Sequence, residues 1–251
     1  MKLRVILTEI LEDPYLNLAI DEALLIKNDL VLRIWRNNMS VVLGILSRVN
    51  DEINLEYITE KNIPLLRRIS GGGSVYHDMG NINYTIIVSR NLNEKVYGID
   101  FLYKKLLNGT INAIELLTNS SPVEVHNESD ITFLGYKISG NAGYILSEKY
   151  MLHGTLLVSA DLSVLYKALI IPPRNLKKSD KIDMVKYKVN NLSSLLNRTI
   201  FFDEVVKAFI KGFEDLLGVE SYLDEITNEE LEIAERLAKE KYSNKGFIFK
   251  R

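Results

Sequence analysis

The residues best suited to chemistry lie together in one stretch, LRRISGGGSVYHDMGN, at positions 66–81. Two arginines, Arg67 and Arg68, lead into three consecutive glycines at 71–73. Because glycine has no Cβ, the backbone there can approach a ligand closely, and its amide groups can converge on an anion. Guanidinium groups are charged donors that match carboxylate or phosphate. The stretch therefore predicts a site for an acidic small molecule, with a phosphate compound as the first choice.

This stretch matches neither of the two common nucleotide-binding motifs. The G-x-x-x-x-G-K-[ST] spacing is absent, and Gly71 and Gly73 are followed by Tyr76 where the dinucleotide pattern needs a third glycine. A flexible turn between two apolar runs is the competing interpretation. We therefore expect any nucleotide site here to be of another kind.

A second candidate group surrounds Lys137. A lysine in a strand usually extends to solvent, but this one precedes a small, flexible run at 139–143, as though another molecule comes close. The three histidines, His77, His126 and His153, share no short ligand spacing. We therefore interpret them as structural residues and not as a zinc site.

The elements that must position these residues alternate between strands and helices. Asp13 as N-cap and Pro14 at the first helical position predict a helix to about residue 27. Strands are expected at 3–10, 30–36, 40–46 and 83–88, and as a hairpin across 133–158 that turns at 147–148. Further helices are expected at 52–62, 99–117, 163–169, 202–217 and 228–242. The predicted fold class is α/β (α+β), with mixed β-sheets flanked by helices in a single domain over 1–251.

The composition argues against several functional classes. The chain has 251 residues, 47% hydrophobic and 25% charged, and its net charge of −2 argues against a broadly basic nucleic-acid binder. No run of about eighteen apolar residues and no signal-peptide pattern is present, so we expect a cytoplasmic protein without membrane contact. Cysteine is absent, which excludes disulfides, thiolate metal ligands and cysteine nucleophiles.

Five stretches of the chain form an ordered set of motifs. They are NLAIDE at 17–22, RRISGGGSVYHDMGN at 67–81, GYKISGNA at 135–142, HGTLL at 153–157 and VNNL at 189–192. In this order they resemble the signature of the lipoate–protein ligase A family. The resemblance extends over nearly the whole chain, so it is more specific than any single motif. It implies the catalytic-domain fold of the biotin/lipoate protein ligases.

The resemblance also implies an activity with two steps. Lipoate and ATP with Mg²⁺ would give lipoyl-AMP and pyrophosphate. The lipoyl group would then pass to a lysine of a carrier domain, in E2 subunits of 2-oxoacid dehydrogenases or in the glycine-cleavage H protein. This chemistry needs no enzyme nucleophile, because the substrate carboxylate attacks phosphorus and the acceptor amine attacks the carbonyl. A fixed cation and backbone amides can supply the electrostatic stabilisation.

By the same resemblance, Lys137 is the catalytic residue and contacts the lipoyl carboxyl and the α-phosphate. The ATP and lipoyl-adenylate site is expected to include Arg68, Ser70, Gly71, Gly72, Gly73, Ser74, Val75, Tyr76, His77, Asn81, Lys137, Ser139, Gly140, Ala142, His153, Gly154 and Thr155. The acyl chain is expected in an apolar slot beside Val75, Tyr76 and the 40–46 strand. A basic loop at 174–188 is expected to fold over bound adenylate. Metal ligands are not assigned.

The chain departs from the family pattern near its C-terminal end. Family members that catalyse both adenylate formation and lipoyl transfer usually carry a small accessory domain. In this chain it would begin roughly at 240–247. We expect none in this chain, so a separate accessory polypeptide would supply it, or the protein would perform only part of the reaction. The alternatives are a transfer-only lipoyltransferase that uses preformed lipoyl-AMP and a non-catalytic lipoate-binding protein. An octanoyltransferase of the same fold would need a cysteine, and biotin ligases have a different adenylate loop.

Overall fold

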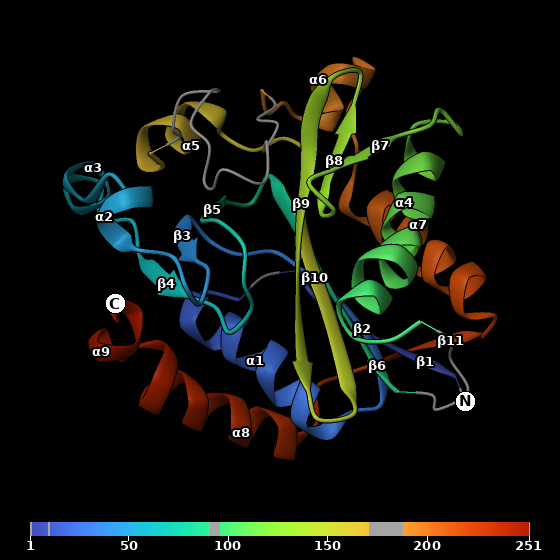
Figure 1. Cartoon of the computed structure of the whole chain (residues 1–251), viewed down its shortest axis with the longest axis horizontal. Helices are drawn as coiled ribbons and strands as arrows, with labels where there is room; N and C mark the ends of the chain where they lie inside the picture. Colours follow the sequence, from blue (N-terminus) through green and yellow to red (C-terminus); the bar gives the residue numbers. More distant parts are fainter. Residues whose placement is uncertain (1, 10, 91–95, 171–187, 251) are drawn as a thin grey trace.

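An eight-stranded mixed sheet runs through the middle of the molecule (Figure 1), and its strand order is β11-β1-β2-β6-β10-β9-β8-β7. The computed structural model describes residues 2–9, 11–90, 96–170 and 188–250. β1 pairs in parallel with β2 and β11, whereas the other neighbours are antiparallel. The strands are β1 (Leu3–Thr8), β2 (Leu30–Trp35), β6 (Asn81–Ser89), β7 (Glu124–His126), β8 (Asp130–Phe133), β9 (Tyr136–Leu146), β10 (Lys149–Leu157) and β11 (Ser221–Asp224).

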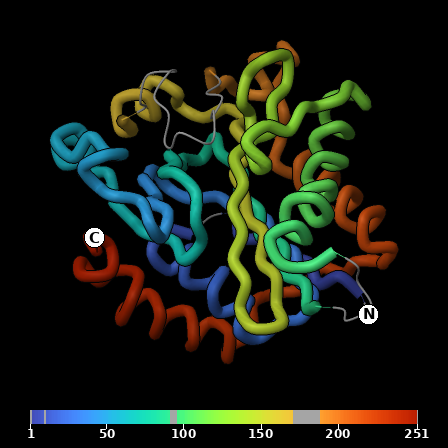
Figure 2. The backbone as a smooth tube through the Cα atoms, in the orientation of Figure 1, coloured from blue at the N-terminus to red at the C-terminus, as the bar shows by residue number. Residues whose placement is uncertain are grey.

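Helices cover both faces of this sheet. One face packs against η1 (Phe101–Leu106), α4 (Leu107–Leu117) and α7 (Phe202–Leu217), which lie to the right of the long hairpin in Figure 1. The other face packs against α1 (Pro14–Lys27), α8 (Asn228–Leu237) and η2 (Ala238–Tyr242). The tube in Figure 2 shows the C-terminal helices side by side with α1 from the opposite end of the chain. Within the described ranges, no helix is long and apolar enough to cross a membrane.

A second sheet of three strands carries the glycine-rich stretch. Its order is β4 (Leu65–Arg67), β3 (Ser40–Leu43) and β5 (Val75–His77), so the glycines connect two strands that flank the same neighbour. Four short helices surround this sheet or lie near it: α2 (Val49–Glu52), α3 (Leu55–Glu60), α5 (Leu162–Ala168) and α9 (Lys245–Ile248). One further helix, α6 (Leu192–Leu196), follows the segment at 171–187, which lies outside the described residues.

The predicted fold class is confirmed, and so are most predicted elements. Asp13 caps α1 by accepting hydrogen bonds from the amides of Tyr15 and Leu16. The expected helix at 52–62 is instead two helices, because Asn54 starts a new one by accepting from the Tyr57 amide. The expected strand at 40–46 ends at Leu43, where the chain turns. Sequence patterns did not predict β5, β8, β11, α6 or α9.

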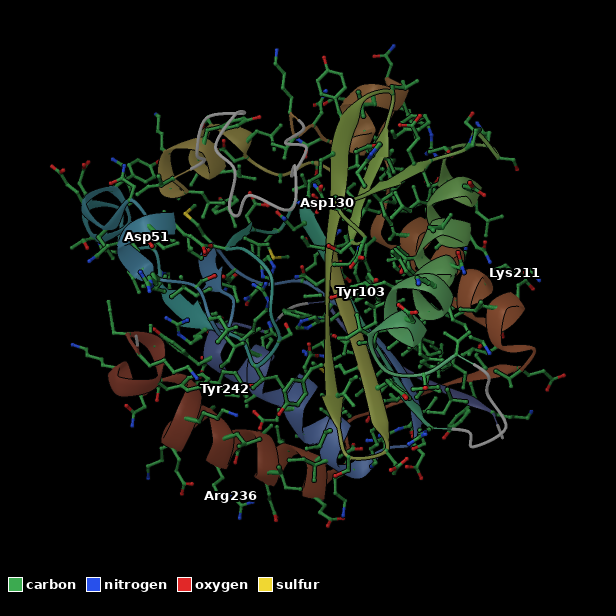
Figure 3. The ribbon with its side chains drawn as sticks, in the orientation of Figure 1. Asp51, Tyr103, Asp130, Lys211, Arg236 and Tyr242 are labelled. Atoms are coloured by element: carbon green, nitrogen blue, oxygen red, sulfur yellow. The ribbon has the colours of Figure 1, made fainter. Side chains whose placement is uncertain are left out.

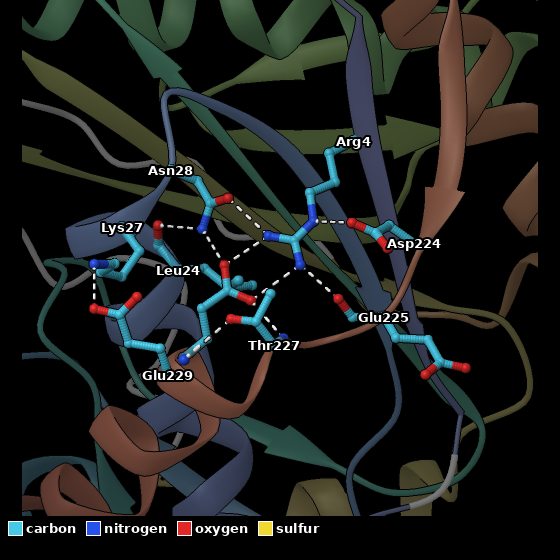
Figure 4. A network of polar contacts seen from close by, with 9 residues as sticks. Arg4, Leu24, Lys27, Asn28, Asp224, Glu225, Thr227 and Glu229 are labelled. Atoms are coloured by element: carbon cyan, nitrogen blue, oxygen red, sulfur yellow. Dashed lines mark hydrogen bonds and ion pairs between the residues drawn. The ribbon is translucent and has the colours of Figure 1, made fainter.

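A buried polar network ties the first strand to the C-terminal helices (Figure 4). Arg4 on β1 donates to both carboxylate oxygens of Glu230 at 2.6 and 3.0 Å, and to Asp224 at 2.8 Å. Glu230 also accepts from Asn28, the C-cap of α1, and closes a capping box with Thr227 at the start of α8. One carboxylate therefore ties β1 and the end of α1 to α8, which lies about 200 residues later in the chain.

Replacing Glu230 by glutamine is expected to destabilise the fold in a pH-dependent way. Burial raises the pKa of Glu230, but hydrogen bonds from Arg4, Asn28 and Thr227 outweigh it and lower the pKa to about 2. A depressed carboxyl pKa contributes stability above the unfolded value of about 4.3, and this contribution is lost as the pH falls toward the folded value. Glu230→Gln should lower the free energy of unfolding by about 3 kcal/mol at pH 7.

Urea denaturation at pH 7 and at pH 3 measures this effect. The difference between the wild type and Glu230→Gln should shrink by about half or more at pH 3, since the unfolded carboxyl is then protonated. An equal difference at both pH values would mean that the ionised carboxylate does not supply the stability.

Candidate functional site

Two rows of small and polar side chains cross one face of the large sheet. Directly paired residues of neighbouring strands share a face, so the strand register identifies both rows. Row one is Trp35, Asn83, Thr155, Gly140 and Asp130, and row two is Arg33, Thr85, His153 and Ala142. We call these nine residues the site floor. A buried sheet face is usually apolar, so a polar and glycine-containing strip of this length marks a candidate site.

The glycine turn (residues 70–74) lies over this floor. A Cβ at Gly72 would lie 3.8 Å from the Ala142 Cβ and 3.0 Å from Arg68 Nη2, and Gly72 has φ +82°. On the other side of the turn, a Cβ at Gly44 would lie 2.0 Å from the Gly72 carbonyl oxygen. Glycine is therefore required at 72 for its backbone angle and at 44 for close approach.

Arg67 is a structural residue, contrary to the expectation that both guanidiniums face an anion. It is fully buried and donates to the carbonyl oxygens of Gly44 at 2.7 Å, Ser47 at 2.8 Å and Ile248 at 2.8 Å. Its donors hold the loop after β3 against the C-terminal helix α9. The residue type predicts an anion contact, but only the structure shows that backbone carbonyls use its donors.

Arg68 points into the glycine turn. It donates to Ser70 Oγ at 3.0 Å and to the Gly73 carbonyl at 2.9 Å, and it also contacts the Gly71 carbonyl. Burial lowers the pKa of Arg68 to about 10, so it stays charged at neutral pH. Because this cation organises the carbonyls of the turn, the amides of Gly71, Gly72 and Gly73 can face other directions, while the Ser74 amide donates to Glu52.

A chain of polar contacts links the turn to helix α1. Ser70 Oγ lies 2.5 Å from His153 Nε2, and His153 Nδ1 lies 3.6 Å from Asp21 Oδ2. Asp21 in turn accepts from Arg33 at 2.8 Å. Burial raises the pKa of Asp21, but His153 and Arg33 outweigh it and lower the pKa. Since Arg68 donates to Ser70 Oγ, we assign the Ser70 hydroxyl as the donor to His153 Nε2 and the imidazole hydrogen to Nδ1, on the side of Asp21.

Lys137 lies at the other end of row one. Its Nζ is 2.5 Å from Asp130 Oδ1, and a Cβ at Gly140 would lie 3.3 Å from both Cε and Nζ of Lys137. The lysine therefore lies across Gly140, beside the upper part of β9 where Figure 3 labels Asp130. Its backbone amide donates to the Lys188 carbonyl. The rest of the basic loop expected to cover adenylate, at 174–187, lies outside the described residues.

The structure brings together many of the residues expected from the resemblance. Arg68, Ser70, Gly72, Ala142 and His153 gather at row two, and Lys137, Gly140 and Thr155 gather at row one. Gly71 and Gly73 belong to the same turn, and Ser74 donates to Glu52 through its amide and its hydroxyl. Val75 packs against the apolar cluster that contains Val42 and Trp35, and the acyl slot expected beside it stays a prediction.

Other expected site residues make contacts that stabilise the fold. Asn81 donates to the Tyr76 carbonyl and to Thr155, and the Tyr76 ring lies in the core of the small sheet. Ser139 and Gly154 lie on the opposite face of the large sheet. A Cβ at Gly154 would lie 2.0 Å from Asn141 Oδ1, so glycine there makes room for the hydrogen bond from Tyr84 to Asn141. Their place in an adenylate site stays a prediction.

The histidines are not arranged as a zinc site. Burial lowers the pKa of His77 to about 3, so its ring is neutral, and it packs edge-on against Trp35. His126 lies 3.0 Å from Glu124 on β7. Among the residues that the structure describes, no three His, Cys, Asp or Glu side chains form a group that could hold a metal.

Sequence reasoning missed several residues of this site, among them Asp130, Asp21 and Gly44. Asp130 lies outside every motif, and only the pairing of β8 with β9 brings it onto Lys137. Asp21 lies within a quoted motif, but its contact with His153 joins segments far apart in the chain. Gly44 lies outside every motif, and no local pattern could have revealed its contact with Gly72.

Replacing Gly44 by alanine is expected to displace the glycine turn. The added Cβ would overlap the Gly72 carbonyl, which is backbone and cannot rotate away. Binding of ATP, the ligand expected from the sequence resemblance, should weaken by about tenfold or more in calorimetry, because small misplacements at a site carry large penalties. The control is Leu46→Ala, since Leu46 is 87% exposed in the same loop. Equal ATP affinity for Gly44→Ala and the control would contradict the role given to this contact.

Comparison with known sequences identifies the relatives of this chain. The family model described as the lipoyl protein ligase A/B catalytic domain matches residues 13–214. Lipoate–protein ligase 1 of Staphylococcus aureus is 33% identical, over 92% of this chain and 68% of its own length. An octanoyltransferase of Bacillus anthracis is 28% identical, over 95% of each chain.

Solved structures show the same fold. A lipoate-protein ligase A bound with ATP has a TM-score of 0.84 at 27% identity, covering 99% of each chain. A bi-partite lipoate protein ligase of Thermoplasma acidophilum, studied with its E2 lipoyl domain, also has a TM-score of 0.84 at 27% identity. That match covers 100% of this chain and 98% of the other. The family model matches residues 13–214, which is most of this chain. The chain therefore belongs to the lipoyl protein ligase A/B catalytic domain family.

Proposed function

We propose that the chain activates lipoate with ATP to lipoyl-AMP and transfers the lipoyl group to a lysine of a carrier domain. One observation carries the proposal. The Lys137 amine lies over Gly140 and the glycine turn lies over Ala142, and these two floor residues are next to each other on one face of β9. Positions i and i+2 of a strand are about 7 Å apart. A fixed cation and a glycine turn thus lie side by side on one face of the sheet, at a spacing that suits the two ends of an acyl-phosphate group.

The first step needs charge stabilisation more than it needs a nucleophile. The lipoate carboxylate attacks the α-phosphorus of ATP, an O–P bond forms, and pyrophosphate leaves. Negative charge develops on the phosphate oxygens, where the Lys137 ammonium and the amides of the glycine turn can stabilise it. Lys137 must exchange its contact with Asp130 for the ligand anion, so Asp130 holds the amine at the site before substrate binds.

The second step transfers the acyl group. The amine of the carrier lysine attacks the lipoyl carbonyl, an amide bond forms, and AMP leaves with the bonding electrons. The same ammonium would stabilise the oxyanion of the tetrahedral intermediate. Arg68, Ser70 and His153 are buried at the glycine turn, and their exclusion of water would help to shield the mixed anhydride.

Mg²⁺ would accompany ATP without a dedicated protein cage. Magnesium in such sites is held by substrate phosphates with one or two carboxylates. Asp130, beside Lys137, can supply one carboxylate, and when bound the ion would neutralise phosphate charge. This fits the described part of the chain, which contains no cluster of three metal-binding side chains.

The proposed partners follow from the relatives. The similar archaeal ligase is bi-partite and was studied with an E2 lipoyl domain. We therefore propose lipoyl carrier domains as acceptors and a separate accessory polypeptide as a partner. Octanoyl transfer is the second candidate, which the Bacillus anthracis relative favours. Transfer through an acyl-cysteine is not available to this chain, because it has no cysteine.

Pyrophosphate exchange and mass analysis of a carrier domain test the proposal. The chain is incubated with lipoate, MgATP and an apo lipoyl domain, and in parallel with the lipoyl domain and synthetic lipoyl-AMP. Exchange and a lipoyl mass shift on the carrier would support both steps in this chain. A mass shift only from lipoyl-AMP would identify a transfer-competent chain that needs its accessory partner. No mass shift in either arm would refute the proposed ligase.

Replacing Lys137 by alanine is expected to lower lipoyl transfer from lipoyl-AMP on the order of 10²–10³-fold, because one stabilising charge at the reacting centre is lost. Thermal unfolding should remain close to that of the wild type, since the ion pair with Asp130 is partly exposed. The matched control is Lys211→Ala, a surface lysine on α7 that Figure 3 labels far from β9. Near-normal transfer by Lys137→Ala would remove the assigned catalytic role.

A further inference from the structure

Asn83 is a buried amide without a partner on the site floor. It is 1% exposed, and neither Nδ2 nor Oδ1 has a hydrogen-bond partner among the described residues. Its neighbours on the same face of β6 differ in this respect. Asn81 donates to Thr155 and to the Tyr76 carbonyl, and Thr85 donates to Asp21. A buried side chain with an unpaired donor and an unpaired acceptor is uncommon in a folded protein and needs an explanation.

The fold itself gives no reason for an asparagine here. Position 83 lies in a central strand, paired with Trp35 on β2 and Thr155 on β10. Asparagine is disfavoured in strands, whereas a β-branched residue would fit the pleated surface. The amide caps no helix and closes no turn that the structure describes. Its polar atoms are therefore better explained by a ligand that lies on the floor.

The position of Asn83 relative to Lys137 suggests which part of a ligand it meets. Gly140, under the Lys137 amine, and Asn83 lie in the same row with Thr155 between them. Neighbouring strands are about 4.8 Å apart, so Asn83 is about 10 Å from Gly140 along the row. An extended octanoyl chain spans nearly this distance. An acyl group whose carboxyl contacts Lys137 would thus place the end of its tail at Asn83, next to Trp35.

The two residues at this end of the row offer complementary groups. Asn83 supplies an amide N–H, and Trp35 supplies an aromatic ring that Arg33 covers at 4.7 Å and His77 meets edge-on. A sulfur atom is a weak hydrogen-bond acceptor and makes favourable contacts with aromatic rings. A dithiolane ring has two sulfurs and can meet both groups, whereas a saturated chain ends in a methyl group and leaves the amide unpaired.

We propose that Asn83, packed beside Trp35, is a specificity-determining residue that favours an acyl tail with a dithiolane ring over a saturated chain of the same length. The proposal rests on the proposed function, because it assumes that the carboxyl end of the acyl group meets Lys137. It adds the residue by which this chain distinguishes lipoate from octanoate.

An isosteric pair of variants tests the role of the polar group without a change of size. Asn83→Thr and Asn83→Val have the same shape and both suit a strand, but only threonine keeps a hydrogen-bonding group. Calorimetry measures the dissociation constants of lipoate and octanoate for each protein, and thermal unfolding verifies that each variant is folded. The ratio of the two constants is the readout. The control is Thr110→Val. This substitution deletes a buried hydroxyl group on α4, which packs against the other face of the sheet.

The wild type and Thr110→Val should prefer lipoate to the same extent. Asn83→Val should reduce this preference by about tenfold, largely through tighter octanoate binding, and Asn83→Thr should stay within about threefold of the wild type. The inference is overturned if the lipoate preference of Asn83→Val stays within about twofold of the wild-type preference. It is also overturned if both variants weaken the binding of lipoate and of octanoate by the same factor. If the wild type binds neither acid, with or without ATP, the proposed function itself fails and the inference with it.

Discussion

The ion pair between Arg33 and Asp21 sets the position of the site. Two charges inside a protein are tolerated only when each is paired and its remaining hydrogen-bonding capacity is used. Here the pair lies between helix α1 and the sheet, with both side chains buried, and Thr85 and His153 use the second carboxylate oxygen. His153 also contacts the Ser70 hydroxyl, and Ser70 accepts a hydrogen bond from Arg68. The glycine turn is thus held to the core through a chain of polar contacts and not through apolar packing alone.

Small residues decide how closely the parts of the site approach. Gly44 and Gly72 let the loop after β3 and the glycine turn come into backbone contact, and Gly140 and Ala142 keep the floor low beneath the turn and Lys137. The two polar ends of the floor then have different chemistry. Lys137 and Asp130 provide charge at β8 and β9, whereas Trp35 and Asn83 provide an aromatic ring and a neutral amide at β2 and β6. This polarity matches a ligand that is anionic at one end and uncharged at the other.

The sequence predicted local structure well and long-range contacts poorly. The capped start of α1, the long hairpin and the glycine turn depend on neighbouring residues, so their patterns are visible in the chain. The role of Arg67 could not be predicted, because its partners come from the loop after β3 and from the C-terminal helix. The same holds for Asp21 and Asp130, whose importance depends on strand register and on the packing of α1. Ser139 and Gly154 show that a motif can be continuous in sequence while alternate residues face opposite sides of a sheet.

A crystal structure of the chain with a non-hydrolysable lipoyl-adenylate analogue tests the central claim most directly. The proposed function predicts that the analogue lies on the site floor, with its phosphate surrogate against the glycine turn. The Lys137 amine should have left Asp130 to contact the acyl–phosphate junction, and the dithiolane should lie at Asn83, next to Trp35. An analogue bound elsewhere, or one on the floor with Lys137 still paired to Asp130, would contradict the catalytic role given to this site.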